Sequence, residues 1–212
     1  MSNIVTRPLT PDPASHGGRG PVEHERRDQI LEAAHSHFRT YGYVKTTVAD
    51  LARAIGLSAA YIYKFFESKQ AIGEAVCRQA LGRIADELRE IAHQPKPAAT
   101  RLRLVFQTVA RRGAELCFTD RKLHDLAVTA CAEKWQPIRD HQAALLEIVR
   151  GLVVAGRESG EFERKTPIAE TSQAILQTLE LFSQPLLLEQ NIDDPEGRAE
   201  SVANLVLRSL AP

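Results

Sequence analysis

Three side chains in the middle of the chain, His124, Cys131 and His141, have the chemistry of a thiol nucleophile or a soft-metal site. Either function needs a third group at a matching position, and the sequence supplies none at a recognisable spacing. Another pair, His35 and His37, is two residues apart and therefore points in different directions on a helix. We expect no catalytic residue, no metal site and no cofactor. A thiol or metal sensor built on the first three side chains remains the alternative to ordinary core or pocket lining.

A second set of side chains, in residues 47–69, has the chemistry of DNA recognition. Ala59 and Ala60 are small enough for a backbone to lie close in the major groove, which is about 12 Å wide. Tyr61, Tyr63 and Lys64 are long enough to reach base edges or phosphate oxygens. A protein without a DNA partner has little reason to expose two tyrosines there. The pattern therefore favours DNA reading over a plain helical hairpin in a bundle core.

Two short helices and a tight turn must position these side chains. Thr47 is an N-cap residue ahead of an apolar stripe with three- and four-residue spacing, and Gly56 ends that first helix. Ser58 caps a second helix, expected over residues 59–66, and Ser68 caps a third. The inward residues of the second helix are Ile62, Phe65 and Phe66. Two short helices joined by a glycine turn form a helix-turn-helix.

Residues 27–72 resemble the DNA-binding domain of the TetR family of bacterial transcription repressors. The residues that match the family pattern are Arg27, Ile30, Ala33, Ala34, Phe38, Gly42, Tyr43, Thr46, Thr47, Leu51, Ala52, Gly56, Leu57, Ser58, Ile62, Tyr63, Phe66, Ser68, Lys69 and Ile72. The resemblance is specific because so many offsets agree at once. Two positions depart from the common pattern: Ala60 stands where glycine is usual, and Tyr61 where a small hydroxyl residue is usual. Both lie on the base-reading face and bear on which operator is read.

The resemblance implies a homodimer that binds double-stranded operator DNA. The DNA-binding residues carried over are Arg27, Thr47, Tyr63, Lys64 and Lys69 at the phosphates, Ala59, Ala60 and Tyr61 at the bases, and Ser58 at the start of the reading helix. The partial positive charge of a helix N-terminus would assist Arg27 at a phosphate. A symmetric dimer is also what two half-sites about one helical turn apart require.

The composition allows a DNA-binding protein but does not demand one. The 212 residues include 27 Lys and Arg against 27 Asp and Glu, and a net charge of zero excludes a protein that seeks polyanions through bulk charge. Residues 24–69 carry a modest excess of basic side chains, which suffices if these lie at phosphates. The three cysteines, Cys77, Cys117 and Cys131, are widely spaced and odd in number, which favours reduced thiols. No apolar run reaches the roughly 20 residues of a membrane helix, so we expect a cytoplasmic protein with no membrane partner.

The periodicity predicts an all-α protein with about nine helices in three parts. Residues 1–22, rich in proline and glycine, are expected to form a disordered arm, either a plain solvated tail or one that reaches a minor groove. Residues 23–68 form the helix-turn-helix domain, which a helix over residues 23–41 opens. Residues 69–212 are helical, and the resemblance implies that they form a ligand-binding and dimerisation domain. A long helix over residues 69–93 joins the two as a rigid lever.

The resemblance places a ligand pocket and a dimer interface in residues 69–212. Aromatic residues with a few polar neighbours suit a mostly apolar pocket, and the candidates are Phe106, Phe118, His124, Trp135, His141 and Leu145. The last two helices of the family pair with a partner subunit, and the candidates here are Ile175, Leu179, Phe182, Val202, Leu205 and Val206. Plain helix packing is the alternative for the first set, and a monomer core is the alternative for the second.

Together these features predict a transcriptional repressor that binds a roughly palindromic operator as a dimer. A small hydrophobic molecule entering the C-terminal domain would release it from DNA. The alternative is a DNA-binding protein that answers to no small ligand and uses its C-terminal domain to dock a protein partner. The two differ in whether lipophilic compounds raise the thermal midpoint of the pure protein, because a ligand that binds only the native state must stabilise it.

Overall fold

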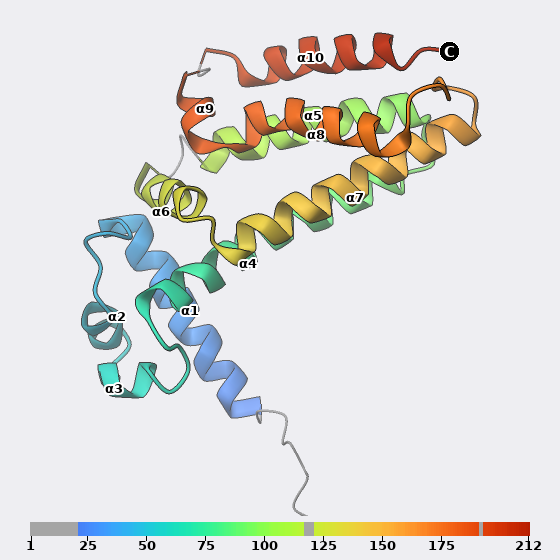
Figure 1. Ribbon diagram of the computed structural model, residues 1–212. Helices are drawn as coiled ribbons and strands as arrows, with labels where there is room; N and C mark the ends of the chain where they lie inside the picture. Colours follow the sequence, from blue (N-terminus) through green and yellow to red (C-terminus); the bar gives the residue numbers. More distant parts are fainter. Residues whose placement is uncertain (1–20, 117–120, 191–192) are drawn as a thin grey trace, which may run out of the picture.

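The computed structural model describes residues 21–116, 121–190 and 193–212, and these ranges form ten helices and no strand (Figure 1). The helices are α1 (Pro21–Tyr41), α2 (Val48–Ala54), α3 (Ala59–Ile62), α4 (Lys69–Ala92), α5 (Ala98–Ala114), α6 (Arg121–Ala132), α7 (Gln136–Glu158), α8 (Ile168–Ser183), α9 (Pro185–Gln190) and α10 (Pro195–Ser209). The all-α prediction is confirmed. The number of helices exceeds the predicted nine because Pro185 starts a separate short helix as well as ending α8.

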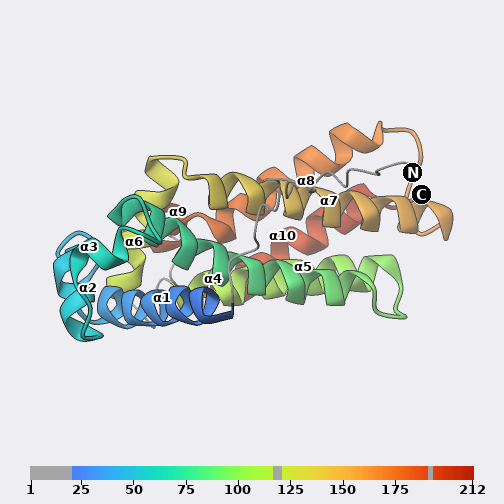
Figure 2. The ribbon, with the colours of Figure 1, turned by 90° about the horizontal axis from the view of Figure 1, so that it is seen from below.

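The helices form a small part and a large part that α4 connects. Helices α1, α2 and α3 lie at one end of the molecule, and α4 runs from them into the bundle of α5, α7, α8 and α10 (Figure 1). Figure 2 shows the same division from below, with the long helices extending away from α1, α2 and α3. Across the described ranges, every helix is too short or too polar to cross a bilayer.

The helix starts around the turn follow the predicted capping chemistry. Thr47 and Asp50 form a capping box, in which the Thr47 Oγ1 accepts from the Asp50 N–H at 3.2 Å and the Asp50 Oδ2 accepts from the Thr47 N–H at 3.0 Å. The hydroxyls of Ser58 and Ser68 each accept from the N–H three residues on, at 3.1 and 3.0 Å. Gly56 has a φ of 68°, a left-handed conformation that favours glycine.

Two predicted boundaries differ from the structure. Helix α3 stops at Ile62, not at Phe66, because the N–H groups of Lys64 and Phe65 bond the carbonyl three residues back, at 3.1 and 2.9 Å. Helix α1 begins at Pro21, since proline is well suited to a first helical position. The arm predicted over residues 1–22 is therefore wrong for its last two residues. Residues 1–20 lie outside the described residues.

Two apolar cores hold the described residues together. The larger core lies among α4, α5, α7, α8 and α10. The smaller core joins α1, α2, α3 and the first half of α4 to Leu126 and Ala130 of α6 and to Trp135, which precedes α7. The helix-turn-helix is therefore completed by residues that follow it by more than fifty positions. We call this smaller core the DNA-binding core.

Candidate DNA interface and ligand cavity

The reading surface consists of the outward residues of α3 and of the turn after it. Ile62 is fully buried beneath this surface, whereas Ala60 and Lys64 are exposed and Tyr63 is 52% exposed. Tyr61 is partly exposed, and the Lys64 Nζ lies 5.5 Å from the centre of its ring. Because Ile62 anchors the helix to the core, its neighbours are held facing outward. A helix that enters a DNA groove needs this arrangement.

The other predicted DNA contacts lie around this surface. Thr47 and Ser58 are exposed at the starts of α2 and α3, and Ala59 is partly buried against the DNA-binding core. The guanidinium carbon of Arg27 lies 4.7 Å from the centre of the Phe66 ring, which holds this charge beside the end of the reading surface. Guanidinium groups and helix N-termini are among the groups that bind phosphates. Contact with DNA itself stays a prediction for each of these residues.

Lys69 occupies a different environment from the one expected of a phosphate contact. Its Nζ donates to the carbonyl oxygens of Tyr43, Val44 and Thr46 at 3.0, 3.3 and 3.1 Å. It also lies 4.5 Å from the centre of the Tyr43 ring. An ammonium group has three hydrogens, and each has a carbonyl acceptor here. A phosphate could bind Lys69 only by replacing one of these hydrogen bonds. In the structure, Lys69 connects the turn after α1 to the start of α4.

Tyr43 also links the turn after α1 to the C-terminal part of the chain, because its ring packs against Trp135. Its ring packs edge-on against Phe38 and Trp135, with centroid distances of 5.2 and 5.5 Å. Trp135 is 2% exposed, and its Nε1 donates to Glu133 at 2.7 Å. A Cβ added at Gly73 would lie only 3.0 Å from the rings of Tyr43 and Trp135, so α4 approaches these two rings as closely as a glycine allows. Trp135, predicted to line a pocket, instead completes the DNA-binding core.

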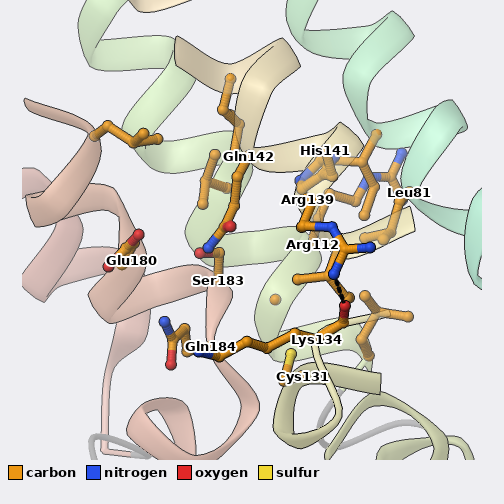
Figure 3. A pocket seen from close by; sticks show the side chains of 17 residues that line it. Leu81, Arg112, Cys131, Lys134, Arg139, His141, Gln142, Glu180, Ser183 and Gln184 are labelled. Carbon is orange, nitrogen blue, oxygen red and sulfur yellow. Dashed lines mark hydrogen bonds between the residues drawn. The ribbon is translucent and has the colours of Figure 1, made fainter. Parts of the chain in front are cut away.

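A cavity of about 520 Å³ lies among α4, α5, α7, α8 and the turn between α6 and α7 (Figure 3). It is lined by Leu81, Ile84, Val109, Arg112, Gly113, Leu116, Cys131, Lys134, Ile138, Arg139, His141, Gln142, Leu145, Leu176, Glu180, Ser183 and Gln184. This volume is typical of sites for small ligands. Apolar side chains from α4, α5, α7 and α8 line it together with charged and amide side chains. We call it the inner chamber.

The structure brings only part of the predicted pocket set to the inner chamber. His141 and Leu145 line it. Phe106 is fully buried in the larger core, and His124 is bonded through Nε2 to Glu189 at 2.9 Å, so neither is among the lining residues. Phe118 lies outside the described residues. Phe106 and Trp135 fill the two apolar cores and therefore leave no space beside them for a ligand.

His141 is a largely buried titratable group of this chamber. Burial lowers its pKa to about 4, although a hydrogen bond with the Leu81 backbone acts in the opposite direction. Its Nδ1 has no hydrogen-bond partner in the described part of the chain. The imidazole is therefore neutral at physiological pH. The charged lining residues are Arg112, Lys134 and Arg139 on the basic side and Glu180 on the acidic side.

Acid should destabilise the protein through His141. The pKa falls from 6.5 in the unfolded chain to about 4 in the folded one, so between these values the unfolded state binds the extra proton. The contribution to stability is complete above pH 6.5 and is lost as the pH falls to about 4, a change of roughly 3 kcal/mol in the free energy of unfolding. Denaturant titrations at several pH values test this. His141→Phe should flatten the profile in that window, and an unchanged profile would contradict the assignment.

The described cysteines do not form a reactive or metal-binding set. Burial raises the pKa of Cys77 to about 12 and also raises that of Cys131, so both thiols stay protonated. Both are free of disulfides, and Cys117 lies outside the described residues. Within those residues, no group of three or more His, Cys, Asp or Glu side chains is arranged to hold a metal ion. Cys131 and His141 line the inner chamber, while His124 does not.

The residues predicted for the dimer interface divide between core and surface. Ile175, Leu179 and Phe182 are buried in the larger core of the protomer, as is Val206, so these four side chains leave little surface for a partner subunit. Leu205 is 67% exposed. Sequence reasoning missed Leu181, an apolar residue that lies off the buried stripe of α8. Leu181 is 39% exposed, and it lines one shallow groove with the partly buried Val202. We call Leu181, Val202 and Leu205 the outer apolar face.

Known families match most of the chain. Residues 30–76 match the family described as bacterial regulatory proteins, tetR family. Residues 98–205 match the family described as tetracyclin repressor-like, C-terminal domain, and this second match alone covers more than half of the chain.

The similar curated proteins are transcription regulators. The HTH-type transcriptional regulator BetI of Cronobacter sakazakii is 29% identical over 147 residues, which are 67% of this chain and 68% of that protein. The HTH-type transcriptional repressor KstR2 of Rhodococcus jostii is 26% identical over 73% of this chain and 74% of its own length. The fatty acid metabolism regulator protein of Bacillus subtilis is 24% identical over 86% of this chain and 94% of its own length.

Solved structures share the fold over nearly their whole length. A TetR-family transcriptional regulator from Pectobacterium atrosepticum has a TM-score of 0.74 at 18% identity, covering 91% of this chain and 98% of that one. The transcriptional regulator FadR from Bacillus subtilis, solved in complex with stearoyl-CoA, has a TM-score of 0.65 at 22% identity, covering 86% and 98%. With both of its domains matched, the chain belongs to the TetR family of bacterial regulatory proteins and is a DNA-binding transcription regulator.

Proposed function

We propose that this regulator is a repressor that binds a roughly palindromic operator as a homodimer in the cytoplasm. It leaves the operator when a small hydrophobic molecule enters the inner chamber. The observation that carries the proposal is the turn between α6 and α7. Lys134 in this turn, Cys131 near the end of α6 and Ile138 near the start of α7 line the chamber. Trp135, also in the turn, packs against Tyr43 in the DNA-binding core. A ligand that displaces the turn therefore displaces the DNA-binding part.

Helix α4 supplies a second connection between chamber and DNA. It begins at Lys69, directly after the reading surface, and its residues Leu81 and Ile84 line the inner chamber. A dimer holds two half-sites only while its reading helices are about 34 to 36 Å apart. A ligand that favours another spacing lowers operator affinity by the ratio of its affinities for the two states. Operator DNA must then weaken ligand binding by the same factor.

The outer apolar face supports the dimer. Leu181, Val202 and Leu205 come from α8 and α10, the helices that the family resemblance assigns to the interface. Exposed leucines on neighbouring helices gain from burial, at about 25 cal/mol for each Å² of apolar surface removed from water. A twofold axis through this face would present two reading surfaces to two symmetric half-sites.

The relatives support an apolar ligand and a repressing role. FadR of Bacillus subtilis was solved with stearoyl-CoA, and KstR2 is named as a repressor. A thermal-shift screen of lipophilic compounds, repeated with operator DNA present, tests the proposal. A ligand present at about a hundred times its Kd should stabilise the protein by about 2.7 kcal/mol and should bind more weakly when DNA is bound. If no compound shifts the midpoint, the alternative of a protein-docking domain is favoured.

Substitutions on the reading surface should separate affinity from specificity. Lys64→Ala should weaken binding to all operator sequences alike and lower the slope of log K against log salt by about one for each protomer. Tyr61→Ala should instead change which bases are preferred, at about 1 to 3 kcal/mol for each discriminated base pair. Salt titrations and binding selections on randomised operators measure both effects. A preserved salt slope for Lys64→Ala would remove this residue from the phosphate contacts.

A further inference from the structure

A second hollow adjoins the inner chamber. It has a volume of about 400 Å³ and is lined by His35, Ala80, Arg83, Ile84, Glu87, Arg112, Glu115, Leu116 and Leu123. Three of these residues, Ile84, Arg112 and Leu116, also line the inner chamber. These shared side chains form a common wall between the two spaces. We call the second space the outer chamber.

The charged part of this wall is held by partly exposed ion pairs. Arg112 donates through Nε to Glu87 and through Nη1 to Glu115, both at 2.7 Å, and Arg111 bonds the same two carboxylates at 2.8 and 3.2 Å. Exposed ion pairs contribute about 0 to 1 kcal/mol each, so the Arg112 side chain can move at low cost. The rest of the wall, Ile84 and Leu116, is apolar. An unbranched hydrocarbon chain suits this passage better than a wide ring system does.

The two chambers differ in their polar groups. In the inner chamber, Lys134, Gln142 and Gln184 have side chains with no hydrogen-bond partner in the part of the chain that the structure describes. Figure 3 shows Lys134 extending toward Gln184, with Gln142 pointing toward Ser183. Basic lining residues outnumber the acidic Glu180 in this chamber. In the outer chamber, by contrast, the basic residues Arg83 and Arg112 are balanced by Glu87 and Glu115, and Arg112 is paired with both carboxylates.

We propose that the two chambers form one site for a linear amphiphile with an anionic head. The head lies against Lys134 and the free amides of the inner chamber, and the chain passes Ile84 and Leu116 into the outer chamber. This inference rests on the proposed function and names the ligand class for the same site. His35 on α1 lines the outer chamber, so the end of a long chain reaches the DNA-binding part directly. Chain length should then decide whether a bound ligand releases DNA.

Binding of octanoate and palmitate to the full-length protein tests the passage. Palmitate should bind at least about tenfold more tightly, because each buried methylene adds about 0.8 kcal/mol. Ala80→Phe fills the outer chamber alone and should weaken palmitate by about tenfold or more while leaving octanoate within about twofold. Ala143→Phe is the matched control, since Ala143 is exposed on α7 and lines neither chamber. It should change neither affinity.

The head group is tested by comparing dodecanoate with dodecanol. Lys134→Met should weaken dodecanoate by about tenfold and leave dodecanol unchanged, since only the carboxylate pairs with an ammonium. Equal losses for both compounds would show that Lys134 acts through packing, and would overturn the anionic head.

Two results would overturn the shared site. One is that Ala80→Phe binds palmitate as the parent does, and the other is that none of the carboxylates binds. Should Ala80→Phe lower the thermal midpoint, His35→Trp serves in its place, because His35 is exposed on α1 and a larger side chain there blocks the same chamber. Either result leaves the proposed function standing if another lipophilic compound releases the operator. Loss of the proposed function would show instead as operator binding that no compound alters.

Discussion

A Leu205→Glu variant is expected to be a monomer that binds its operator at least about a hundredfold more weakly, since burying an unpaired carboxylate costs several kcal/mol. Leu205 is 67% exposed on α10, three residues after Val202, which lines one groove with Leu181. An exposed position means that the change does not disturb the protomer core. The variant should therefore keep its helical circular dichroism and still lose association. A single protomer holds one half-site, so operator affinity falls with the dimer.

Light scattering and gel-shift titration measure the two effects. Leu205→Met is the control, because it preserves an apolar side chain of similar volume and should remain a dimer. Leu179→Glu is a poor test of association, since Leu179 is fully buried and the charge would unfold the protomer. A Leu205→Glu protein that stays dimeric would place the interface on another face.

Trp135→Ala is expected to lower the free energy of unfolding by about 3 to 5 kcal/mol, the usual cost of truncating a buried tryptophan. The lost contacts are those with Tyr43 and α4 at Gly73, which join the DNA-binding core to the turn beside the inner chamber. Operator binding should weaken in the same variant because Tyr43 supports the carbonyls that hold Lys69. Thermal denaturation and gel-shift titration give both values.

Trp135→Phe separates stability from signalling. It keeps most of the apolar volume but removes the bond from Nε1 to Glu133 and shortens the reach toward Tyr43. The coupling factor, the ratio of ligand affinities without and with operator DNA, should fall toward one while each affinity measured alone changes little. A variant in which this ratio equals that of the parent would show that α4 alone carries the signal.

The helix-turn-helix could be predicted in detail because its signals are local. The caps at Thr47, Ser58 and Ser68 and the turn at Gly56 are set by neighbouring residues, and all four occur where the sequence indicates. Lys69 shows the limit of this reasoning. Its place in the family pattern indicates a phosphate contact, but its carbonyl partners lie 23 to 26 positions earlier in the chain.

The cavity and the outer apolar face could be predicted only in outline, because each depends on which helices meet. Periodicity shows that Leu179 and Leu205 both lie on apolar stripes, yet one is fully buried and the other is exposed. On α10 the small residues Ala199 and Ala203 face inward, where α5 packs closely, and this leaves the larger leucine outside. The lining of the inner chamber also depends on how the helices meet, because Phe106 is buried in the larger core whereas His141 lines the chamber.

The composition of the DNA-binding core limits where domains can be exchanged between regulators of this family. Leu126, Ala130 and Trp135 close that core from α6 and the turn after it. A hybrid that joins residues 21–76 to a foreign effector domain would therefore leave Tyr43 without Trp135 and expose part of α1. Recombination at that junction should yield DNA-binding domains of low stability, unless the helix of the foreign domain that corresponds to α6 has the same apolar surface. The portable unit is a discontinuous one, made of residues 21–76 together with residues 121–138.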